Sequence, residues 1–186
     1  MTASTTSPAK SEESRPVSPL IIGIGASAGG LEALQQFFQH MPGNSGACFV
    51  VVQHLSPDYK SLMADILGKH TQMRVIQAEN EMPIRPNTVF LIPPKNNMTI
   101  KDGKLHLTEF VHGMLNHPID VFFNSLAEEQ KERAIVVVMS GTGSDGTSGV
   151  KVVKEHGGLV IVQDPETAKF DGMPRSVINT GLADFV

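Results

Sequence analysis

Five unbroken apolar segments divide this sequence and constrain its fold more than any other feature. Each has four to seven residues, and most are rich in Val and Ile. A strand with one face in water alternates apolar and polar residues, whereas a strand covered on both faces, as in a parallel sheet, reads as a continuous apolar run. We therefore predict buried strands at residues 20–25, 47–53, 89–92, 134–140 and 159–163.

Helix-like spacing lies between many of these segments. In residues 30–41 the large apolar side chains fall on one helical face, namely Leu31, Leu34, Phe38 and Met41. Further helices are expected at residues 60–69, 119–130, 146–156 and 173–179. Strands and helices alternating at this spacing predict an α/β fold, with a doubly wound, mainly parallel sheet in a Rossmann-like three-layer arrangement.

One segment breaks this alternation. Residues 97–108 alternate apolar and polar side chains and centre on Asp102-Gly103, a pair that favours a tight two-residue turn. Such a turn places two apolar pairs on one face, Ile100 opposite Leu105 and Met98 opposite Leu107. We expect a small antiparallel hairpin here, at one edge of the sheet.

The composition limits the classes of function. Hydrophobic residues make up 40% of the 186 residues and charged residues 18%, which excludes global disorder. The net charge of −4 argues against a broad nucleic-acid-binding surface. The single cysteine, Cys48, excludes an internal disulfide and a cysteine-based zinc site. No apolar run approaches the ~20 residues of a membrane span. We expect a cytoplasmic protein without membrane insertion.

The N-terminal segment differs from the rest of the chain. Residues 1–17 are rich in Ser, Thr, Pro and Glu and show no periodicity. Such a composition cannot build a core, so we expect a disordered tail or linker there. Residues 18–186 are then expected to form a single domain.

The first strand ends in a glycine-rich turn, residues 23–30, for which three interpretations compete. A dinucleotide-binding turn would use Gly23, Gly25 and Gly29 to approach a phosphate, but it also needs an acidic residue near the end of the second strand, which this sequence lacks. A nucleophile elbow, G-x-S-x-G, would lift the hydroxyl of Ser27 out of the sheet. The third interpretation is a plain turn with a helix-capping serine.

A nucleophilic Ser27 would need a base and an acid. Of the seven histidines, only His54 directly follows a predicted core strand. Ligands of open α/β sheets bind at the carboxyl ends of the strands, so the first two strands could deliver both residues to one rim. Asp145 lies in a second glycine-rich turn, residues 140–149, and could orient the histidine. The alternative roles are a structural histidine and a helix-capping aspartate.

Three of these segments together resemble the catalytic domain of CheB-type protein-glutamate methylesterases. They are G-I-G-A-S-A-G-G (23–30), V-V-Q-H-L-S-P (51–57) and S-G-T-G-S-D-G-T-S-G (140–149). F-D-G-M-P-R (170–175) and H-P-I-D (117–120) resemble further family segments. The likeness runs from about Leu20 to the end of the sequence.

The resemblance implies a Ser-His-Asp triad in which Ser27 is the nucleophile, His54 the general base and Asp145 the acid that orients it. It also implies an oxyanion hole that uses the backbone N–H of Thr142, with the N–H of Ala28 as the second donor. Many family members carry Thr where this sequence has Ala28. The backbone N–H is unaffected, so we expect an altered rate rather than lost chemistry.

The activity implied is that of a serine carboxylesterase acting on glutamate γ-methyl esters of a methyl-accepting chemoreceptor, in chemotaxis-type signal adaptation. Glutamine deamidation is a second implied reaction, and neither needs a metal or an organic cofactor. Candidate substrate contacts are the basic residues Lys95, Lys101 and Arg175, for which the favoured alternative is an ordinary solvated surface charge. Met63, Met139 and Met173 could line an apolar rim, but packing in the core is the favoured alternative for them.

Two expectations concern the wider context of the chain. The best-known family members carry an N-terminal receiver domain, which 17 polar residues cannot form. We therefore expect a module of a longer protein, such as one fused to a CheR-like methyltransferase or a signalling kinase. The alternative function, from another class, is a non-enzymatic signalling module that binds a receptor or partner on the same fold.

Overall fold

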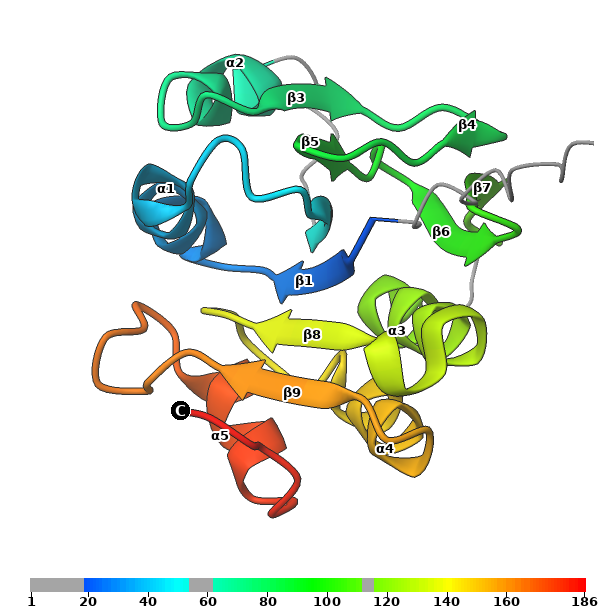
Figure 1. Cartoon of the computed structure of the whole chain (residues 1–186). Helices are drawn as coiled ribbons and strands as arrows, with labels where there is room; N and C mark the ends of the chain where they lie inside the picture. The colour runs from blue at the N-terminus through cyan, green and yellow to red at the C-terminus, as the bar shows by residue number, and fades with distance from the viewer. Residues whose placement is uncertain (1–18, 54–61, 112–115) are drawn as a thin grey trace, which may run out of the picture.

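A six-stranded parallel sheet forms the centre of the molecule (Figure 1). The computed structural model describes residues 19–53, 62–111 and 116–186. The strand order is β3-β5-β2-β1-β8-β9, and every neighbouring pair is parallel. The strands are β1 (Ile21–Ala26), β2 (Cys48–Gln53), β3 (Arg74–Gln77), β5 (Thr88–Leu91), β8 (Ile135–Val138) and β9 (Leu159–Val162). The predicted α/β class and parallel sheet are confirmed.

Helices cover both faces of this sheet and give three layers. One buried apolar cluster joins the sheet to α1 (Gly30–His40) and α2 (Leu62–Gly68). A second cluster joins the opposite face to α3 (Pro118–Gln130), α4 (Thr147–Glu155) and α5 (Gly172–Ile178). A short 3-10 turn, η2 (Lys131–Arg133), follows α3. All five predicted helices are present, and each predicted end that lies within the described residues is displaced by at most one residue.

Two glycines of β1 set how closely α3 approaches the sheet. A Cβ at Gly23 would lie 3.1 Å from Phe122, and one at Gly25 would lie 2.6 Å from Cγ2 of Ile119. Gly25 is therefore a strand residue that makes room for a helix. The N-terminal turn of α3 can lie this close to the end of β1 because Gly25 has no side chain.

The predicted hairpin forms, but its location differs from the expectation. β6 (Asn96–Lys101) and β7 (Lys104–Glu109) pair with the predicted register, and both turn residues have positive φ, 51° at Asp102 and 69° at Gly103. With β4 (Met82–Pro83) they make a separate sheet of order β4-β7-β6. This sheet packs on α3 through the buried side chains of Met98, Ile100 and Leu105 instead of extending the main sheet.

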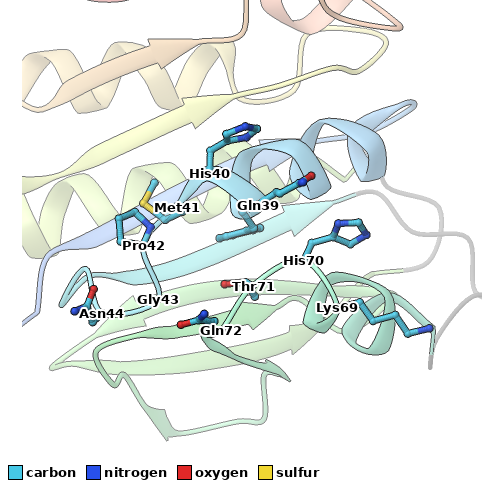
Figure 2. Close-up of a pocket in the computed structure, with 11 residues that line it drawn as sticks. Gln39, His40, Met41, Pro42, Gly43, Asn44, Lys69, His70, Thr71 and Gln72 are labelled. Atoms are coloured by element: carbon cyan, nitrogen blue, oxygen red, sulfur yellow. The ribbon is translucent and has the colours of Figure 1, made fainter.

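Loops at the amino ends of the strands line an open pocket of about 630 Å³ (Figure 2). Its walls are the end of α1 with the loop that follows it, residues 38–44, and the segment after α2, residues 69–72. Because β2 and β3 begin after these two loops, the pocket lies at the edge of the sheet opposite the carboxyl ends of the strands.

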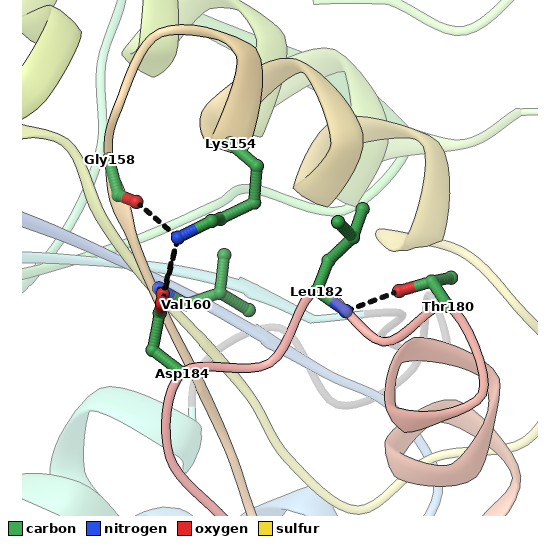
Figure 3. Close-up of polar contacts among 6 residues, drawn as sticks. All are labelled: Lys154, Gly158, Val160, Thr180, Leu182 and Asp184. Carbon is green, nitrogen blue, oxygen red and sulfur yellow. Dashed lines mark hydrogen bonds and ion pairs between the residues drawn. The ribbon is translucent and has the colours of Figure 1, made fainter.

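The C-terminal residues run along the outer edge of β9 (Figure 3). Asp184 bonds Lys154 Nζ at 2.7 Å and accepts the Val160 N–H at 2.8 Å, while Phe185 forms a parallel bridge with Ile161. Lys154 Nζ also donates to the Gly158 carbonyl at 3.3 Å. These contacts satisfy backbone groups that would otherwise be unpaired at a sheet edge.

Two further expectations concern the N-terminal tail and the membrane. The predicted tail, residues 1–17, lies outside the described residues. Within the described ranges, no helix is both long and apolar enough to cross a membrane.

Candidate functional site

The sheet has a switch point between β1 and β8, and two glycine-rich turns meet there. From β1 the chain continues to β2 on one side, and β8 later joins on the other side. Ser27 directly follows β1, and residues 139–146 connect β8 to α4. In open α/β sheets, ligands bind at the carboxyl ends of strands beside such a switch point.

Hydrogen bonds fix the backbone around Ser27. Its N–H donates to the Ser140 carbonyl at 2.9 Å. Its carbonyl accepts the Gly30 N–H at 2.9 Å and Gln53 Nε2 at 3.3 Å. The next N–H, that of Ala28, belongs to the same trans peptide and so points in the opposite direction. Within the described residues, this N–H has no protein acceptor.

Gly29 supplies the conformation that the turn needs. Its φ is 71°, in the left-handed region, and α1 begins at the next residue. A Cβ at Gly29 would lie 2.7 Å from Ser140 Oγ and 2.8 Å from Lys169 Cβ. The tight turn predicted from G-x-S-x-G is present, and its closest neighbours come from the β8–α4 loop and residues 169–170.

The loop after β8 passes directly beside Ser27. A Cβ at Gly141 would lie 3.0 Å from Ser27 Cβ. The Gly141 carbonyl accepts the Met173 N–H at 2.9 Å, so the N–H on the other side of that peptide, from Thr142, points away from Met173. In the described part of the chain the Thr142 N–H also has no acceptor. Two backbone N–H groups close to Ser27 thus have no protein acceptor among the described residues: that of Ala28, the next residue, and that of Thr142, which follows Gly141 beside Ser27.

Asp145 occupies the same end of the sheet and is only 5% exposed. Its Oδ2 accepts the Ile119 N–H at 3.1 Å and its Oδ1 the Asp120 N–H at 3.0 Å. Both amides belong to the first turn of α3, where the helix dipole favours a negative charge. Ile119 also contacts Gly25 of β1. Asp145 is therefore held beside the strand that carries Ser27.

His117, Asp120 and Asp145 form a cluster whose ligand atoms lie within 4.8 Å of one another. His117 Nδ1 is 3.8 Å from Asp145 Oδ1. Asp120 accepts the Gly149 N–H at 2.7 Å, and burial raises the pKa of its carboxyl group. These residue types can ligate a cation, but both carboxylates already receive backbone N–H donors, which accounts for their placement.

His54, the predicted base, lies outside the described residues. The residue before it, Gln53, is paired in parallel register with Ala26, the residue before Ser27. Strands β1 and β2 therefore end side by side.

The predicted substrate contacts have different surroundings. Lys95 lines a pocket of about 130 Å³ together with Gln53, Phe110 and Pro118. Arg175 is exposed and its Nε bonds Asp171 at 2.5 Å. Met173 is fully buried beside Gly141 and belongs to the core cluster, which agrees with the core-packing alternative and not with a substrate contact in this conformation. Met63 and Met139 are buried as well.

Two residues that the sequence analysis did not assign to the site contact its backbone. They are Gln53 and Ser140, which bond the peptide groups around Ser27. The available signal was their position in the sequence: Gln53 is the last residue of β2, and Ser140 closely follows β8. The bonds themselves join residues 26 and 112 positions apart, which spacing does not reveal.

The chain is similar to known proteins over most of its length. The family model for CheB methylesterase matches residues 22–186. A protein-glutamate methylesterase/protein-glutamine glutaminase of Thermotoga maritima is 35% identical over 175 residues, which are 91% of this chain and 51% of that protein. An uncharacterized 104.1 kDa protein of Rhodobacter capsulatus is 51% identical over 122 residues, which are 66% of this chain and 13% of that protein. The chain thus spans about half or less of these two relatives.

A solved structure gives the same relationship. The crystal structure of the Thermotoga maritima CheB methylesterase catalytic domain matches with a TM-score of 0.83 at 35% identity. The match covers 91% of this chain and 93% of that one.

Proposed function

Because this chain belongs to the CheB methylesterase family, we propose that it is a serine carboxylesterase that hydrolyses glutamate γ-methyl esters on chemoreceptor-like proteins. The observation that supports the proposal is that Ser27 lies beside the Gly141–Thr142 segment at the switch point that also holds Asp145, while the N–H groups of Ala28 and Thr142 have no acceptor among the described residues. A nucleophile beside convergent donors suits acyl transfer.

The proposed reaction has two steps. His54 takes the proton of Ser27 while Ser27 Oγ attacks the ester carbonyl, and Asp145 stabilises the resulting imidazolium. The tetrahedral intermediate collapses, His54 protonates the departing methoxide, and methanol leaves. Water, deprotonated by His54, then attacks the acyl-enzyme. The second tetrahedral intermediate collapses, His54 returns the proton to the departing Ser27 Oγ, and the glutamate product is released.

The N–H groups of Ala28 and Thr142 are the proposed oxyanion donors. Both peptides are held from their carbonyl side, so neither donor needs to reorganise when the oxyanion forms. Each such donor is worth about 3–4 kcal/mol, or 10²–10³ in rate. Deamidation of glutamine would follow the same route, with ammonia leaving in place of methanol.

The proposed partner is a methyl-accepting chemoreceptor or a similar methylated signalling protein, and the family context also suggests further domains in a longer parent protein. Lys95 is the favoured contact for an acidic receptor segment, because it is exposed and its pocket adjoins Gln53. Arg175 is a weaker candidate, because Asp171 already neutralises its charge.

Covalent labelling tests the nucleophile. A fluorophosphonate should label the wild-type protein at Ser27, and Ser27→Ala should abolish the labelling without loss of the folded state. Methanol release from methylated receptor should disappear in the same variant. The rate should rise between about pH 5 and 8, where a histidine base loses its proton.

The matched control is Ser125→Ala, which also removes a serine hydroxyl. Ser125 lies on α3, bonds Phe122 and Ile100, and should not affect labelling. A folded wild-type protein that binds methylated receptor but is not labelled at Ser27 would instead support the non-enzymatic binding module.

A further inference from the structure

Ser140 links the two backbone segments that surround Ser27. Its side chain is fully buried, although a serine hydroxyl needs hydrogen-bond partners in such a place. Its Oγ donates to the Ala28 carbonyl at 2.8 Å and accepts the Phe170 N–H at 3.0 Å. One hydroxyl thus joins the turn after β1 to the segment before α5.

The first bond of Ser140 acts on the turn that carries Ala28. The Ser140 carbonyl accepts the Ser27 N–H, and the Ser140 hydroxyl bonds the Ala28 carbonyl. These two groups belong to the peptides immediately before and after the one that bears the Ala28 N–H. Together with Gln53 and Gly30 on the Ser27 carbonyl, they restrain three consecutive peptide planes.

The second bond of Ser140 acts on the loop that carries Thr142. Phe170, held by the hydroxyl, accepts the Gly141 N–H through its carbonyl at 2.9 Å. Three residues further on, the Met173 N–H bonds the Gly141 carbonyl at 2.9 Å. That carbonyl shares a peptide with the Thr142 N–H, so the direction of this donor depends on the position of segment 170–173.

We infer that Ser140 is a positioning residue for catalysis: its hydroxyl sets the orientation of both proposed oxyanion donors, the Ala28 and Thr142 N–H groups, at once. The inference rests on the proposed esterase function. Ser140 itself has no contact with the reacting atoms in this scheme, because its Oγ is occupied by Ala28 and Phe170. Its effect should therefore appear in the transition state and not in substrate binding.

Kinetics of Ser140→Ala test the inference against a matched hydroxyl deletion. Ser125 has the same bonding pattern away from the site, since its Oγ donates to the Phe122 carbonyl at 2.9 Å and accepts the Ile100 N–H at 3.1 Å. Both variants should lose stability in urea titrations. For Ser140→Ala we also expect kcat per folded molecule to fall about 10- to 100-fold with KM nearly unchanged, less than the 10²–10³-fold loss for deleting a donor outright.

The other variants make the outcome decisive. Ser140→Thr retains the hydroxyl and should recover most of kcat. Should Ser140→Ala fail to fold, Ser140→Cys replaces it, because a thiol fills the space but is a weak donor and acceptor; its kcat should also fall. The rate of fluorophosphonate labelling at Ser27 should follow kcat in every variant.

Two results would overturn the inference. One is an unchanged kcat in folded Ser140→Ala, or in folded Ser140→Cys where the alanine variant does not fold. The other is a folded Ser140→Thr as slow as Ser140→Ala, which would mean that local shape, not the hydroxyl, controls the rate. Failure of the wild-type protein to hydrolyse methyl esters would refute the proposed function instead, so the two failures are distinguishable.

Discussion

Gly25→Ala should destabilise the protein by forcing α3 away from β1. The new Cβ would lie 2.6 Å from Ile119 Cγ2 and 3.3 Å from Phe123 Cζ. Carbon atoms pack best at about 3.5–4.0 Å, so the helix must move by roughly 1 Å. Overpacking of this kind costs about 1–3 kcal/mol. In a chain of this size that corresponds to a fall in Tm of about 2–4 °C for each kcal/mol.

Urea denaturation, with Gly68→Ala as the control, measures this cost. Gly68 ends α2, and a Cβ there would meet nothing within 4 Å. Gly68→Ala should therefore be neutral or stabilise by up to about 1 kcal/mol, since alanine loses less conformational entropy than glycine on folding. The change at Gly25 should also lower esterase activity, because the Ile119 N–H that would move is a hydrogen-bond donor to Asp145.

A double-mutant cycle identifies the contact responsible. Ile119→Ala alone should cost about 2–5 kcal/mol through the cavity it leaves. In combination with Gly25→Ala the new methyl group partly fills that cavity, so the double variant should lose at least about 1 kcal/mol less than the sum of the single variants. Strict additivity, or a Gly25→Ala variant as stable as Gly68→Ala, would refute the packing argument.

Three further predictions concern groups whose pKa is shifted. Burial raises the pKa of the Cys48 thiol to about 12, so it should react with a disulfide reagent at pH 8 only at the rate of unfolding, and fast labelling of the native protein would contradict this. Burial raises the pKa of the Asp120 carboxyl group, so the folded state holds the Asp120 proton more tightly than the unfolded state does. The free energy of unfolding should therefore fall as pH rises from the ordinary aspartate range through the raised pKa. In urea titrations at several pH values, Asp120→Asn should flatten this part of the stability profile. The hydrogen bond from Lys154 lowers the pKa of Asp184, so this ion pair stabilises the folded protein above the ordinary aspartate range, and the stabilisation is lost in acid. Asp184→Asn should lower the free energy of unfolding by about 0.5–1 kcal/mol at pH 7, as for a solvent-screened pair. It should have no effect once Asp184 is protonated in both the folded and the unfolded protein.

Local patterns were sufficient for most of the main sheet and the helices. Unbroken apolar runs predicted five strands, because a strand that is buried on both faces must carry apolar side chains on both. β3 was missed because it lies at the edge of the sheet, where its outer residues are exposed and its four residues read R-V-I-Q. The hairpin turn was predictable, since Asp102 and Gly103 determine its geometry locally, but its packing on α3 was not.

Some residues of the candidate site could likewise be found from the sequence, and others only from the structure. Order along the chain and strand ends led to Ser27 and Asp145, and the resemblance assigned roles to them. The sequence left both a rim and a core position open for Met173, because methionine suits either, and the packing beside Gly141 places this side chain in the core. The positions of Ser140 and Gln53 relative to Ser27 depend on which strands are neighbours, and sequence spacing does not contain that information.

From the sequence alone came the strand–helix alternation, the two glycine-rich turns and the candidate nucleophile, because backbone preference and burial act over a few residues. Tertiary structure alone decided the orientation of the Ala28 and Thr142 N–H groups, the burial of Asp145 against α3 and the bonds of Ser140. The physical reason is that a hydrogen bond needs its two atoms within about 3 Å, and only the packed sheet brings residues more than 100 positions apart to that distance.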